Sequence, residues 1–144
     1  MRLPVRLTVL LVVCATKAQA VVSGSEQRVA LSGIEITKAF TGFSISYSPS
    51  GWADAGIHEE YHEGGIWKGF YYSRGPVPFA GRWRVSKGQL CVSPDTSAVV
   101  SRWFVGERCR TVWRDRITGR LLVKHLNPRL TDDPYSVQVR ALRR

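Results

Sequence analysis

The sequence predicts a mainly β, single-domain fold in which one short N-terminal helix precedes a curled antiparallel sheet or small barrel. Short segments of alternating apolar and polar residues recur along the chain, which is typical of half-buried strands. Turns rich in glycine separate these segments. No helical pattern lies between consecutive predicted strands, and a parallel sheet would need such crossover connections.

Residues 1–20 have the layout of a secretory signal peptide and are expected to lie outside the fold. Arg2 and Arg6 supply a positive start, and residues 7–15 form an apolar run. That run is shorter than the roughly 20 residues that a membrane-spanning helix needs. Ala18 and Ala20 form a small-x-small cleavage motif, so we expect a periplasmic or secreted protein cleaved near Ala20.

Cys14 offers a second interpretation of the leader, as a lipoprotein signal with an acylated cysteine. Such signals place a small residue before the cysteine, and Val13 fits that position poorly. We therefore expect soluble export, with lipidation of Cys14 as the alternative. No later segment has the length and apolar character of a transmembrane helix, so none is expected.

The formal charge of +10 is unevenly distributed along the chain. Most acidic residues outside the leader precede residue 64, and most basic residues follow it. The basic part is expected to be a solvated surface that favours solubility. The alternative is that the acidic segment packs against the basic one.

The helix is expected over residues 33–41, after a flexible tether at residues 21–30 and at the start of a domain covering residues 31–144. Ser32 can cap the helix, and Glu35 stands three residues later, which completes a capping box. Gly42 follows the last helical residue, as glycine often does.

Two segments show the strand pattern most clearly. In residues 43–48 every second side chain is apolar, as in a strand with one buried face. In residues 57–62 the alternation places Ile57, Glu59 and Tyr61 on one face. Further strands are expected over residues 66–73, 80–86, 89–92, 107–114, 120–124 and 135–141.

Cys91 and Cys109 are the two cysteines that remain after the leader, and an exported chain is expected to pair them. The disulfide would join the predicted strands 89–92 and 107–114. A closed loop of about 19 residues corresponds to about 3 kcal/mol of stabilisation. A metal pair is not favoured, because the chain has no C-x-x-C spacing.

The stretch from His58 to His62 fits H-E-x-x-H, which binds zinc in metallopeptidases when it lies on a helix. Nearby glycines on both sides leave about seven residues for such a helix, which is marginal. In a strand, His58, Glu60 and His62 would instead share one face and could hold a metal at the surface. A metal-dependent hydrolase using His58, Glu59 and His62 remains an alternative.

Other catalytic patterns are weak, and no catalytic residue or cofactor is assigned. Glu59, Glu60 and Glu63 could form a carboxylate pair for glycoside hydrolysis. Nothing in the sequence fixes their separation, so we expect them to be solvated on an exposed hairpin. The chain has no G-x-S-x-G and no glycine-rich phosphate loop.

Arginine and tryptophan alternate in the basic part, which is typical of surfaces that bind anions. In an exported protein this pattern favours an anionic envelope component over nucleic acid, which is not expected as a partner. The alternative is that Trp67, Trp83 and Trp113 fill the core while the arginines face water. The candidate contacts for an anion or ligand are Arg82, Arg84, Trp103, Arg108 and Arg110.

The order of several short motifs resembles a family of small exported bacterial proteins of unknown function. The matching residues are Leu31-Ser32-Gly33-x-Glu35-Ile36, Phe40-x-Gly42, Trp67, Phe70-Tyr71, Gly75, Gly81-x-Trp83-x-Val85, Leu90-Cys91, Cys109 and Val112. This resemblance implies a one-domain periplasmic sheet protein with a disulfide, and it implies no activity. The His58 to His62 stretch lies outside these residues.

From these observations we expect a non-enzymatic binding or accessory module. Its partner would be an anionic envelope component or another periplasmic protein.

Overall fold

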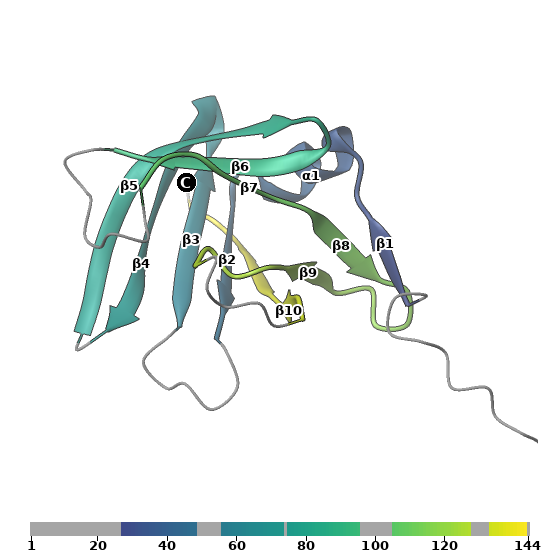
Figure 1. Cartoon of the computed structure of the whole chain (residues 1–144). Coiled ribbons are helices and arrows are strands. Elements are labelled where there is room, and N and C mark those ends of the chain that lie inside the picture. Colours follow the sequence, from purple (N-terminus) through teal and green to yellow (C-terminus); the bar gives the residue numbers. More distant parts are fainter. Residues whose placement is uncertain (1–26, 49–55, 74, 96–104, 128–132, 144) are drawn as a thin grey trace, which may run out of the picture.

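A computed structural model describes residues 27–48, 56–73, 75–95, 105–127 and 133–143. They form two antiparallel sheets and one α-helix, which confirms the predicted mainly β fold (Figure 1). The strands of the larger sheet, in spatial order, are β11 (Gln138–Ala141), β2 (Phe43–Tyr47), β3 (Ile57–His62), β4 (Ile66–Ser73), β5 (Gly75–Ser86), β6 (Gln89–Pro94) and β7 (Arg108–Arg110). Those of the smaller sheet are β1 (Arg28–Ala30), β8 (Val112–Asp115), β9 (Leu121–Val123) and β10 (Tyr135–Ser136).

The larger sheet is curled rather than closed into a barrel. Its order places β11 and β7 at its two edges. Figure 1 shows β6 and β7 arching over β2 and β3, with the smaller sheet continuing from β7. The strands of the larger sheet therefore have an inner, concave side and an outer side.

Helix α1 (Gly33–Phe40) begins at the predicted capping box and is one residue shorter than predicted. The Glu35 carboxylate accepts from the Ser32 backbone N–H at 2.8 Å, and the Ser32 hydroxyl accepts from the Glu35 N–H at 3.4 Å. Ile36 and Phe40 are fully buried and anchor the helix to the core. Gly42 follows with a φ of 79°, a left-handed conformation that suits glycine.

Strands β3 and β4 match their predicted bounds, but two predicted strands each divide between the sheets. The segment 107–114 is β7 in the larger sheet and β8 in the smaller one, with Thr111 between them. The segment 135–141 is likewise β10 and β11, separated by the buried Val137. In both cases the chain passes from one sheet to the other through a single residue.

The expected tether at residues 21–30 needs a correction at its end. Arg28–Ala30 is β1, which pairs with β8 of the smaller sheet. The Arg28 guanidinium also lies 3.2 Å from the Asp133 carboxylate. These residues belong to the folded domain because the β8 edge supplies their backbone partners.

The core lies between α1 and the concave side of the sheets, and its largest fully buried side chains are Trp67, Tyr61 and Phe40. The predicted disulfide is present: Cys91 of β6 and Cys109 of β7 are direct cross-strand partners. In the described residues, no helix has the length and apolar character required to cross a membrane.

Candidate functional site

Strand β3 carries two different polar groups on its two sides. Its inward residues Ile57, Glu59 and Tyr61 are buried, with relative exposures of 3%, 0% and 0%. The outward residues His58, Glu60 and His62 are partly exposed and form what we call the outer row. A charged side chain thus alternates with apolar ones on the buried face, which requires partners for its charge.

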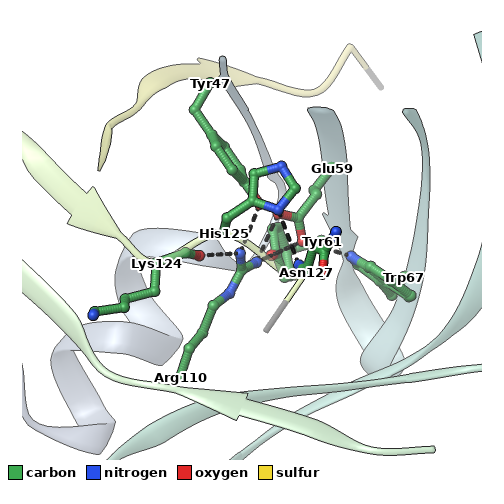
Figure 2. Close-up of polar contacts among 8 residues, drawn as sticks. All are labelled: Tyr47, Glu59, Tyr61, Trp67, Arg110, Lys124, His125 and Asn127. Atoms are coloured by element: carbon green, nitrogen blue, oxygen red, sulfur yellow. Dashed lines mark hydrogen bonds and ion pairs between the residues drawn. The ribbon is translucent and has the colours of Figure 1, made fainter. Parts of the chain in front are cut away.

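The Glu59 carboxylate is enclosed by hydrogen-bond donors from four other residues (Figure 2). It accepts from the hydroxyls of Tyr47 at 2.9 Å and Tyr61 at 2.5 Å. The Trp67 indole N–H donates at 3.1 Å. Arg110 Nη2 donates to both carboxylate oxygens, at 2.7 and 2.6 Å. We call these five residues the buried cluster.

Arg110 reaches this carboxylate across the interior of the curled sheet. It stands on β7, four strands from β3 in the sheet order, and its exposure is 6%. Its Nη2 also donates to the Tyr61 hydroxyl at 2.7 Å, and its Nη1 donates to the Tyr47 hydroxyl at 2.9 Å and to the Lys124 carbonyl at 3.1 Å. Side chains therefore close the curl that the backbone leaves open.

The surroundings of the buried cluster determine the protonation states of Arg110, Tyr47 and Tyr61. Burial tends to lower the pKa of Arg110, but the combined interactions with Glu59, Tyr61 and Tyr47 outweigh it, so the pKa lies well above its usual range. Burial, together with the nearby Glu59 charge, raises the pKa values of the Tyr47 and Tyr61 hydroxyls. The guanidinium stays charged and both phenols stay protonated at neutral pH. Because its oxygens are occupied and inaccessible, Glu59 is suited to structure rather than proton transfer.

The burial of Glu59 contradicts one prediction from the sequence. This residue was expected to be solvated together with Glu60 and Glu63, whereas it is fully buried and paired with Arg110. Its alternation with Ile57 and Tyr61 was a visible signal of burial. Nothing in the sequence indicated that Arg110 would be its partner.

The outer row is held together by its central carboxylate. Glu60 Oε1 lies 3.3 Å from His58 Nε2, and Oε2 lies 3.0 Å from His62 Nε2. His58 Nδ1 is 2.9 Å from the Ser46 hydroxyl oxygen, so both ring nitrogens of His58 have partners. Partial burial tends to raise the pKa of Glu60. The hydrogen bonds with His62 and His58 lower it by more, so the pKa lies below its usual value.

This arrangement does not assemble the metal site considered from the sequence. Residues 57–62 are a strand, so the helix that a zinc peptidase motif requires is absent at this place. His58 and His62 lie on opposite sides of Glu60 and do not converge with it on one point. Among the described residues, the side chains close enough to share one ion are Cys91, Glu107 and Cys109. The two sulfur atoms of that set are joined in the disulfide.

An open groove lies beside the outer row. Four residues cross the outer face in register, as successive cross-strand partners: Gln138 of β11, Ser46 of β2, His58 of β3 and Phe70 of β4. With Ser48 and Tyr72 they line a groove of about 320 Å³, which we call the outer groove. Its size is at the lower end of the roughly 300–1,000 Å³ that small-molecule sites occupy.

A second hollow lies at the opposite end of the outer row and has a volume of about 740 Å³. His62 and Glu63 line one part of it, and Thr41 and Arg143 line another. Its walls carry charges of both signs and two aromatic rings, those of Phe43 and His62.

The alternating Arg82-Trp83-Arg84 segment divides between the two sides of β5. Trp83 points inward, is 9% exposed and donates from its indole N–H to the His62 carbonyl at 2.9 Å. Arg82 is exposed and donates to the Gly64 carbonyl at 3.0 Å. Arg84 is exposed but forms a two-bond ion pair with Glu107, at 2.7 and 2.8 Å.

Among the described residues, the remaining candidates for anion contact do not lie with Arg82 and Arg84 on the exposed, outer side of the sheet. Arg110 was expected as a surface contact, and this is wrong because it is buried against Glu59. Arg108 is the register partner of the buried Val92, so it faces the inner side and is half-buried. Trp103 lies outside the described residues.

Of the three tryptophans considered for the core, Trp67 and Trp83 are buried and Trp113 is half-buried.

No protein-family model, curated protein or solved structure matches this chain.

Proposed function

We propose that this chain is an exported, non-enzymatic binding module whose binding surface is the outer face of the larger sheet around His58. Export is supported by the signal-like layout of residues 1–20 and by the disulfide, because disulfides persist in oxidising compartments. We therefore expect a partner among envelope or extracellular components.

The observation that carries the proposal is the separation of polar groups by β3. The buried acid, Glu59, has its oxygens occupied by a guanidinium, two phenols and an indole, and it has no access to solvent. The accessible polar groups lie on the other face, beside the outer groove. A groove with a few fixed polar side chains and aromatic walls is the usual form of a small-ligand site.

The two alternatives receive less support from this geometry. A hydrolase using His58, Glu59 and His62 would need Glu59 beside the two histidines, but Glu59 points to the other face of the strand. An anion-binding face of four arginines is reduced to Arg82 and Arg84, and Glu107 neutralises the second.

The experiment is a titration of the ¹⁵N-labelled exported protein, followed by amide chemical shifts. The probes are neutral polysaccharide, acidic polysaccharide and anionic lipid vesicles, with mass spectrometry of each probe after incubation. We expect one class to shift amides on β11, β2, β3 and β4 while its mass stays unchanged. His58→Ala should weaken these shifts, and the matched surface variant Arg84→Ala should leave them unchanged.

Two results would contradict the proposal. One is chemical conversion of a probe that is lost in a point variant, which would indicate an enzyme. The other is binding of every active probe on surfaces away from the outer groove, with β2 to β4 unaffected.

A further inference from the structure

We infer that the outer groove binds a neutral saccharide, with one or two pyranose rings lying along its aromatic side. This inference rests on the proposed function and specifies its ligand class. It follows from three properties of the lining: its aromatic side chains, its neutral polar side chains and its charge.

The aromatic side of the groove consists of His58, Phe70 and Tyr72. The His58 and Phe70 rings are stacked, with centroids 5.0 Å apart, and Tyr72 meets Phe70 edge-on at 5.4 Å. Tyr72 is the exposed member, at 46%. Aromatic faces carry partial negative charge, so they attract the slightly positive C–H groups on the faces of a sugar ring.

The position of Tyr72 is set by the backbone beneath it. Its N–H donates to the Gly56 carbonyl at 2.9 Å. A Cβ added at Gly56 would lie 3.3 Å from Tyr72 Cδ2, closer than an ordinary contact. The absence of a side chain at Gly56 therefore lets this ring lie against the sheet, along the wall of the groove.

The opposite side of the groove offers hydroxyl and amide groups from Ser46, Ser48 and Gln138. Hydroxyls and amides both donate and accept hydrogen bonds, which matches the mixed requirement of sugar hydroxyls. The Ser46 hydroxyl is already oriented by His58 Nδ1 at 2.9 Å, and the other side of that ring is held by Glu60. The polar groups are thus partly ordered before a ligand arrives, which reduces the entropic cost of binding.

The charge of the residues that line the groove favours a neutral ligand over an anionic one. None of the described residues that line the outer groove is Lys, Arg, Asp or Glu. A phosphate or carboxylate placed there would lose hydration without gaining a cationic partner. A neutral ring with apolar faces and a polar edge meets complementary groups on both sides.

The test is isothermal titration calorimetry of the exported protein with neutral tetrasaccharides of glucose and of N-acetylglucosamine, and with an acidic galacturonate tetrasaccharide. We expect measurable binding of at least one neutral probe. Tyr72→Ala should weaken its Kd by about tenfold or more, because an exposed stacking partner is lost. Tyr72→Phe, which keeps the ring, should change the Kd by less than about threefold.

Ile117→Ala is the matched control, because Ile117 is also an exposed apolar residue, at 74%, and lies on a turn after β8. Its Kd should equal that of the unchanged protein. Urea unfolding of all three variants shows that each is folded before its affinity is compared.

The inference is overturned if neither neutral probe binds at millimolar concentration, if the acidic probe binds more tightly, or if Tyr72→Ala binds as well as Ile117→Ala. If lipid vesicles or another probe shift the groove amides while neutral saccharides do not, the saccharide assignment fails and the proposed function stands. If a saccharide is cleaved by the protein, the proposed function itself fails.

Discussion

The two faces of β3 each carry one glutamate, and the two glutamates lie in opposite settings. On the inner face, Glu59 is fully buried and its charge is matched by Arg110 at 2.6 Å. On the outer face, Glu60 is partly exposed and lies between two histidines at 3.3 and 3.0 Å. Neighbouring carboxylates thus differ because successive side chains of a strand point to opposite sides of the sheet.

This difference indicates that the inner group contributes more to the stability of the fold than the outer group, part of which we propose as a binding surface. Removing one member of a buried ion pair leaves an unpaired charge in the core, which costs about 3–5 kcal/mol. Exposed pairs contribute about 0–1 kcal/mol, because water already solvates their charges. Substitutions in the outer row are therefore expected to change the stability of the fold little.

The largest effect is expected for Arg110→Met, which leaves the Glu59 carboxylate buried and unpaired. We expect a loss of about 3–5 kcal/mol in the free energy of unfolding, measured by urea denaturation. The double variant Glu59→Leu with Arg110→Met should recover part of this loss, because both charges are then removed. A loss below about 1 kcal/mol in the single variant would show that the ion pair does not close the curl.

The second-largest effect is expected when the disulfide is removed. Cys109 lies beside Arg110 on β7 and points to the opposite side of the sheet. Replacing both Cys91 and Cys109 with serine should lower the free energy of unfolding by about 3 kcal/mol, as expected for a loop of this size. The reduced, unchanged protein serves as a control and should show a similar loss. Equal stability of the oxidised and serine forms would mean that the inner pair alone holds β7.

A smaller change in the free energy of unfolding is expected when the hydroxyl is removed from either of two tyrosines on opposite sides of the sheet. Tyr61→Phe removes a hydroxyl that donates to Glu59 and accepts from Arg110, and it should cost about 1.5–3 kcal/mol. Tyr72→Phe changes an exposed residue and should stay within about 0.5 kcal/mol. Similar losses in both variants, measured by thermal and urea unfolding, would remove the distinction between the faces.

The smallest effect is the contribution of Glu60 to acid stability. Its folded pKa lies below the unfolded value of 4.5, so its contribution is present above that pH and is lost as the pH falls through the folded pKa. His58, His62 and the cross-strand Lys68 are the charged or titratable neighbours. The stability difference between the unchanged protein and Glu60→Gln should therefore shrink as the pH falls from about 5 to about 3. A difference that grows as the pH falls through this range would contradict this assignment.

Sequence periodicity predicted the local elements that repeat a clear pattern. The capping box at Ser32 and Glu35 is formed, β3 has its predicted bounds, and Cys91 pairs with Cys109. Each of these depends on neighbouring residues or, for the disulfide, on the single possible cysteine pair outside the expected leader.

Features that depend on distant partners could not be predicted in this way. The apolar pattern of residues 107–114 continues across Thr111, so the change of sheet between β7 and β8 leaves no break in the sequence. Arg110 and Glu59 are 51 positions apart, and many arginines could have filled that role. The outer groove likewise depends on the register of β11, β2, β3 and β4, which the alternation of each strand does not specify.

The most direct measurement compares the free energies of unfolding of Glu59→Gln and Glu60→Gln in urea at pH 7. The substitution is chemically identical at two adjacent residues, and only the face of the strand differs. We expect Glu59→Gln to cost about 3 kcal/mol or more, because Arg110 loses its counter-charge in the core. Glu60→Gln should cost less than about 1 kcal/mol. Equal losses, or a larger loss at Glu60, would contradict the assignment of fold stability to the inner face of β3 rather than to its outer face.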